Sequence, residues 1–74
     1  MKLTIEYCLV WNYHPRAAGL ADEIRKKKPH LNVELIKSTG GAFEIRLDGK
    51  LIFSKLQENR FPDTEEILNQ IPPR

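Results

Sequence analysis

The chain has 74 residues, which is enough for one small domain and too few for a second hydrophobic core. Hydrophobic residues make up 41% of the sequence and charged residues 30%, without repeats or low-complexity segments, as is typical of a globular protein. The formal net charge is only +2, and the basic cluster at residues 25–28 stands where a helix is expected to end. A nucleic-acid-binding function is therefore not expected.

Cys8 is the only cysteine, which excludes a disulfide within the chain and argues for a reducing compartment. The longest nearly apolar segment, residues 7–11, is far shorter than the roughly 20 residues that cross a bilayer. Glu6 interrupts the first apolar run and no small-residue cleavage pattern follows, so a signal peptide is not expected. These features together predict a cytoplasmic protein.

The first part of the chain predicts a strand followed by a helix. Apolar and polar residues alternate over residues 2–8, which is the pattern of a strand. From Pro15, apolar residues recur at helical spacing until Pro29 stops the helix. Either Asn12 or His14 is the expected N-cap. The apolar face of the predicted helix consists of Ala17, Leu20, Ala21 and Ile24.

Three further strands are predicted after the helix. Alternation over residues 31–35 predicts the second strand, and residues 38–41 predict a flexible turn. Residues 43–47 alternate in the same way, and residues 50–54 form the returning strand. Between them, Asp48-Gly49 is a strong signal for a type I′ hairpin, because both central residues of that turn need positive φ.

The last part of the chain predicts a loop and a short helix. Residues 55–62 are interpreted as loop. Asp63 is then the expected N-cap of a helix, with Glu66 reaching back in a capping box. The inward side of this helix is predicted to consist of Ile67, Leu68 and Ile71. Pro72-Pro73 is expected to end it.

The resulting order, β-α-β-β-β-α, predicts one α/β domain over residues 1–74. A strand–helix–strand start implies a parallel, right-handed crossover, and the hairpin adds an antiparallel pair. Because the strands alternate, both helices are expected on one face of a four-stranded mixed sheet of order 2-1-3-4. This thioredoxin-like two-layer sandwich brings the turn at Thr39-Gly40-Gly41 beside the loop that follows Cys8.

Four segments of the sequence resemble the selenoprotein W-like family. They are Ile5-Glu6-Tyr7-Cys8, Pro15-Arg16-Ala17-Ala18, Thr39-Gly40-Gly41-Ala42-Phe43-Glu44-Ile45 and Asp48-Gly49-Lys50-Leu51-Ile52-Phe53-Ser54. Members are small thioredoxin-like proteins with Cys-x-x-Cys or Cys-x-x-selenocysteine after the first strand. The resemblance implies a thioredoxin-like fold and a thiol-redox or glutathione-linked role. Cys8 matches the first position of the motif, whereas Trp11 stands at the second.

The first functional hypothesis is monothiol oxidoreductase-like chemistry in cell redox homeostasis, with Cys8 as the catalytic nucleophile. A single thiol can form a mixed disulfide with glutathione or a client protein and be released by a second external thiol. The N-terminus of the following helix would stabilise the thiolate. Thr39 and Gly40 are the predicted contacts of the thiol partner, through their exposed backbone. No bound cofactor is expected.

The second hypothesis is a non-enzymatic protein-binding module that kept the fold and lost the redox pair. Leu9, Val10 and Trp11 would then dock a partner, since tryptophan is enriched at binding hot spots. Two alternatives stay open: Trp11 fills space over the end of the sheet, and Cys8 is a small buried hydrophobe. A homodimer, linked through Cys8 or non-covalent, is a further possibility. The chain has too few clustered ligands to predict a metal site.

Overall fold

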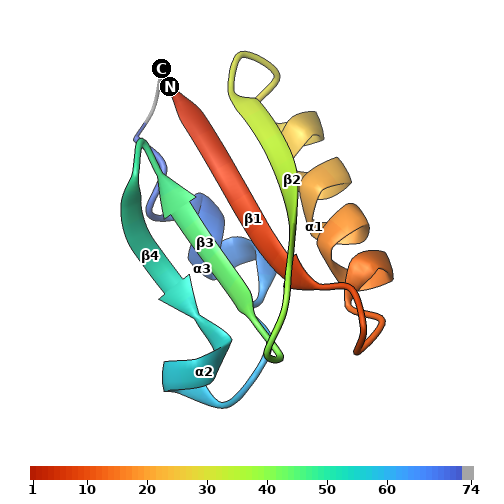
Figure 1. The fold of residues 1–74 in the computed structure, drawn as a ribbon. Helices are drawn as coiled ribbons and strands as arrows, with labels where there is room; N and C mark the ends of the chain where they lie inside the picture. The colour runs from red at the N-terminus through yellow and green to blue at the C-terminus, as the bar shows by residue number, and fades with distance from the viewer. Residues whose placement is uncertain (73–74) are drawn as a thin grey trace.

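The computed structural model describes residues 1–72 and shows a four-stranded sheet with α1 and α3 packed on one face (Figure 1). The elements are β1 (Lys2–Cys8), α1 (His14–Lys27), β2 (Asn32–Ser38), β3 (Phe43–Leu47), β4 (Lys50–Ser54), α2 (Lys55–Glu58) and α3 (Thr64–Leu68). The strand order is β2-β1-β3-β4, with β1 parallel to β2 and antiparallel to β3. The predicted fold class and strand order are therefore confirmed.

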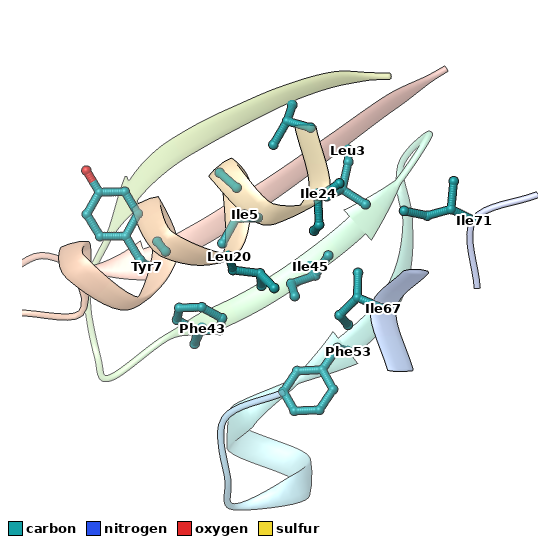
Figure 2. Close-up of a cluster of buried hydrophobic side chains, with 13 residues drawn as sticks. Leu3, Ile5, Tyr7, Leu20, Ile24, Phe43, Ile45, Phe53, Ile67 and Ile71 are labelled. Carbon is teal, nitrogen blue, oxygen red and sulfur yellow. The ribbon is translucent and has the colours of Figure 1, made fainter. Parts of the chain in front are cut away.

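The core lies between the sheet and the two helices, and Figure 2 shows its larger side chains. It forms because apolar residues alternate along the central strands and recur at helical spacing in α1. The fully buried large aliphatic and aromatic residues are Leu3, Ile5, Ile24, Phe43, Ile45 and Ile67. The opposite face of the sheet is more polar, with an ion pair between Glu6 and Arg46 and another between Lys2 and Glu34.

α1 begins one residue after its N-cap Tyr13, so the prediction of Asn12 or His14 as N-cap is wrong. Asn12 adopts a φ of +60° and donates its N–H to the carbonyl of Leu9 at 3.0 Å, closing a turn instead of capping the helix. Tyr13 makes no capping hydrogen bond through its side chain, and its ring packs against Phe61. Tertiary packing therefore decides where this helix starts.

The basic cluster falls at the end of α1, as predicted. Arg25, Lys26 and Lys27 occupy the last turn, where cations complement the helix dipole. Arg25 also donates from Nη2 to the carbonyl of Val33 at 2.9 Å, which fastens the helix end to β2. β2 itself runs further than the alternating residues predicted, because its parallel pairing with β1 continues to Ser38.

The hairpin between β3 and β4 has the predicted backbone. Asp48 has a φ of +51° and Gly49 a φ of +86°, so both central residues lie in the left-handed region. The N–H of Lys2 also donates to the Asp48 carboxylate at 2.9 Å, which ties the turn to the start of β1.

The prediction that residues 55–62 form only loop is wrong, because α2 occupies their first half. Ser54 caps this helix by accepting the N–H of Gln57 at 3.4 Å, and Asn59 ends it with a φ of +59°. Four residues are too few to show helical periodicity, so the helix depends on these two caps.

The predicted capping box of α3 is confirmed. The N–H of Asp63 donates to Oε1 of Glu66 at 2.8 Å, and Arg60 binds both carboxylate oxygens of Glu66, at 2.6 and 2.9 Å. The hydrogen bond from Arg60, followed by that from the Asp63 backbone, lowers the pKa of Glu66 to about 2. α3 ends at Leu68, four residues before Pro72, and Pro73 lies outside the described residues.

The inward residues of this segment are also confirmed. Ile67 is fully buried, Leu68 packs against the core, and Ile71 is buried beyond the end of the helix.

Across residues 1–72, every helix is too short or too polar to traverse a lipid bilayer.

Candidate functional site

Cys8 is the last residue of the central strand β1 and is followed by the β1–α1 loop (residues 9–13). This loop and the β2–β3 loop (residues 39–42) lie at the same end of the sheet (Figure 1). Its backbone N–H donates to the carbonyl of Ala42 at 2.8 Å, and its own carbonyl accepts the N–H of Tyr13 at 3.2 Å. The N–H of Leu9 donates to the carbonyl of Ser38 at 3.3 Å. These bonds hold Cys8 between both loops and the start of α1.

The Cys8 side chain is 1% exposed, yet it is not part of the main hydrophobic core. Strand alternation places it on the opposite face of β1 from Tyr7, which is a core residue. The ring of His14 lies edge-on to Tyr7 with centroids 5.4 Å apart, and so belongs to the helix-covered side. The thiol is therefore buried although it lies on the face of the sheet that the helices do not cover.

Three consecutive apolar residues after Cys8 are exposed. Leu9 is 50%, Val10 81% and Trp11 60% accessible to solvent. Exposed apolar side chains that are adjacent in a loop are more notable than single ones scattered over a surface. The β1–α1 loop thus presents an apolar tip directly beyond the thiol.

Part of the Trp11 indole lies against the backbone of Gly41, although the residue is 60% exposed. A Cβ on Gly41 would stand 2.7 Å from Cζ3 of the indole and 3.1 Å from two other ring carbons. The other neighbour is Tyr13, whose ring is edge-on to the indole with centroids 6.0 Å apart. Trp11 therefore packs over the end of the sheet and still leaves most of its surface in solvent.

An aromatic cluster of Tyr13, Phe43 and Phe61 connects this loop to the core. Tyr13 and Phe61 have ring centroids 4.9 Å apart, and Phe43 and Phe61 5.1 Å apart, both edge-on. The guanidinium of Arg16 lies 4.3 Å from the centre of the Phe61 ring. The sequence did not predict this cluster, because its members are far apart in the chain.

The structure brings the predicted site segments together. The Leu9–Ser38 hydrogen bond and the Trp11–Gly41 contact join the β1–α1 loop to the β2–β3 loop that contains Thr39 and Gly40. Gly40 has a φ of +69° and open space where a Cβ would be, so its backbone is approachable. Contact of Thr39 and Gly40 with a thiol partner stays a prediction.

The surface of the described residues also has two hollows. A hollow of about 650 Å³ is lined by residues at the opposite end of β1, including Met1, Lys28 and His30. A smaller hollow of about 210 Å³ is lined by residues of α1 and by Phe61. Within residues 1–72, no three His, Cys, Asp or Glu side chains are grouped closely enough to bind a metal ion.

A 2-1-3-4 mixed sheet with α1 and α3 on one face and a free cysteine at the end of β1 define a small two-layer α/β protein. The model of the Rdx family matches residues 2–72, and the chain belongs to this family. The resemblance inferred from the sequence is thereby confirmed.

Solved structures agree with this assignment. The selenoprotein W-related protein of Vibrio cholerae is 31% identical with a TM-score of 0.88, over 92% of this chain and 88% of that one. A protein of Bordetella parapertussis is 25% identical with a TM-score of 0.85, over 95% of this chain and 96% of that one.

Two curated relatives also match. The proteins called migration and invasion enhancer 1 of Bos taurus and of Mus musculus are each 30% identical over 71 residues. The match covers 96% of this chain and 62% of each relative, so the chain spans about three fifths of their length.

Proposed function

We propose that this chain is a cytoplasmic, thiol-linked redox protein limited to monothiol exchange at Cys8. Its membership of the Rdx family supports a redox association. The observation that carries the proposal is the position of the only thiol of the chain, at the end of β1 where the family's motif begins. With one cysteine in these 74 residues, every disulfide that Cys8 forms has its other sulfur outside them.

The exchange needs two steps, with glutathione as the external thiol. The Cys8 thiolate attacks one sulfur of oxidised glutathione, a mixed disulfide forms, and one glutathione thiolate leaves. A second glutathione thiolate then attacks the glutathione sulfur of the mixed disulfide, which releases the Cys8 thiolate and regenerates oxidised glutathione. The backbone of Thr39 and Gly40 would flank the glutathione peptide. A client-protein disulfide enters the same scheme in place of oxidised glutathione.

Burial of the thiol sets a condition on this chemistry. With 1% of Cys8 exposed, a disulfide as large as glutathione reaches the sulfur only after the loops around it move. The exchange rate is then the rate for a free thiol multiplied by the fraction of molecules in the open state. Folded protein is expected to react more slowly than unfolded protein, but at a rate that exceeds global unfolding.

Mass spectrometry after incubation with oxidised glutathione tests the proposal. A mixed disulfide on Cys8 that forms under native conditions, and that reduced glutathione removes, would support it. Cys8→Ser is the control that must show no adduct. An adduct that forms only in denaturant would contradict monothiol exchange and leave Cys8 as a structural residue. A dimer on non-reducing gels would instead indicate a Cys8-linked homodimer.

The second candidate is the non-enzymatic binding module, which the exposure of Leu9, Val10 and Trp11 favours. In Cys8→Ser protein, a photo-crosslinking residue at Val10 should capture a protein partner or a second copy of the chain. The same residue at Lys50, which is exposed in the distant β3–β4 hairpin, is the control. Equal capture at both positions would argue against a docking loop.

A further inference from the structure

The contact between Trp11 and Gly41 joins two loops that are far apart in the sequence. The indole lies so close to the Gly41 backbone that a Cβ there would come within 2.7 Å of a ring carbon. Gly40, the preceding residue, has a similar positive φ of +69° but nothing within 4 Å of its Cβ position. The indole can therefore lie at this position only because Gly41 has no side chain.

The same two loops surround Cys8. Ala42, which follows Gly41, accepts the N–H of Cys8, and Tyr13, two residues after Trp11, donates to the carbonyl of Cys8. The first of these bonds joins the end of β1 to the β2–β3 loop, and the second ties the end of the β1–α1 loop back to Cys8. Cys8, which these two loops flank, is 1% exposed.

We propose that Trp11 is a latch: its indole, seated on Gly41, holds the two loops closed around Cys8 and limits access to the thiol. The consequence for catalysis rests on the proposed monothiol function, whereas the latch itself does not. Trp11 is 60% exposed and does not belong to the main core, so its indole can move away from Gly41 without unfolding the core. In this protein the residue at the second motif position acts on Cys8 by enclosing it.

Alkylation of Cys8 by iodoacetamide under native conditions measures the latch without any redox partner. Trp11→Ala is expected to raise the labelling rate about three- to tenfold, the range that the loss of one partly buried apolar contact with Gly41 implies. Val10→Ala is the matched control, because it removes a more exposed side chain of the same loop. Equal labelling rates in the two variants would overturn the proposal.

Global unfolding must be separated from loop opening. Ile67→Val weakens the core in α3, outside the two loops, and serves as the control for general instability. If labelling occurs through opening of the two loops, Trp11→Ala labels faster than its loss of stability alone would predict. Ile67→Val calibrates that prediction, because it relates the labelling rate to the change in urea midpoint. If both variants follow one line of rate against stability, labelling occurs by global unfolding and the proposal fails.

Gly41→Ala tests the same contact from the other loop. Its Cβ would displace the indole, so it should accelerate labelling and increase quenching of the single tryptophan by acrylamide. Gly40→Ala carries similar positive-φ strain without the clash and should do neither. In a Trp11→Ala background, labelling of the two alanine variants should become equal. If Gly40→Ala and Gly41→Ala label at equal rates while Trp11 is present, the latch is contradicted.

The glutathione adduct separates the latch from the monothiol function. Faster alkylation of Trp11→Ala without any native glutathione adduct would leave the latch standing and reject monothiol exchange. A native adduct whose rate Trp11→Ala leaves unchanged would keep monothiol exchange and reject the latch.

Discussion

Replacing Phe61 with alanine is expected to destabilise the protein more than its partial burial suggests. The Phe61 ring lies edge-on to Tyr13 at 4.9 Å and to Phe43 at 5.1 Å, which connects the β1–α1 loop to the core. Two such pairs contribute about 1–3 kcal/mol beyond burial. A half-buried phenylalanine adds about 1 kcal/mol from the apolar surface it removes from water. Phe61→Ala should therefore cost about 2–4 kcal/mol.

Urea unfolding followed by circular dichroism measures this cost, and thermal unfolding gives a second estimate. The melting temperature of a domain of this size falls by about 4–8 °C for each kcal/mol. Phe61→Leu is the matched control, because leucine keeps most of the apolar contact and loses the edge-on ring pairs. It should cost about 1–3 kcal/mol, the contribution of the two ring pairs alone.

The reasoning would be refuted by a loss below about 1 kcal/mol for Phe61→Ala, since burial alone would then account for it. It would also be refuted if Phe61→Leu were as stable as the natural protein, because the ring pairs would then contribute nothing. Trp11 fluorescence adds a local readout, since the indole lies edge-on to Tyr13. Loss of Phe61 should free Tyr13 and make the indole more accessible to acrylamide.

Two further predictions concern charge and backbone. Because Arg60 holds the pKa of Glu66 at about 2, below its ordinary 4.5, the ion pair stabilises the fold above pH 4.5 and this stability is lost as the pH falls toward 2. Urea midpoints from pH 5 to 2 should fall less steeply in Glu66→Gln, with a smaller difference in high salt; parallel curves would contradict the ion pair. Gly49→Ala should destabilise by about 1 kcal/mol because of positive φ, whereas Gly19→Ala, in open space within α1, should stabilise by up to about 1 kcal/mol. Urea unfolding of both variants decides this, and the same sign for both would refute it.

Most of the fold could be predicted because its signals are local. Period-2 alternation identified the strands, the Asp48-Gly49 pair identified the hairpin, and the β-α-β start required a parallel β1–β2 pair. The Asp63–Glu66 capping box also depends on residues three apart. Each of these patterns constrains the backbone within a few residues, so a single sequence is sufficient to recognise it.

The start of α1 and the presence of α2 were missed for two physical reasons. α2 has a Ser-x-x-Gln pattern at Ser54 and a left-handed cap at Asn59, and these signals would have found it despite its length. The start of α1 has no such signal. Tyr13 is its N-cap because the ring packs on Phe61, which is a contact between distant parts of the chain.

The candidate site depends on the same kind of distant contact. The sequence placed Cys8 and Trp11 at the two motif positions. It did not predict that Cys8 is buried or that Trp11 packs on Gly41, because that contact joins two loops that are distant in the chain. Gly41 looked like a turn glycine, and its φ of +74° fits that role. Only the fold shows that the missing Cβ also makes room for the indole. A glycine at that position thus serves both the turn and the packing of Trp11, and substitutions at either residue should be interpreted through the other.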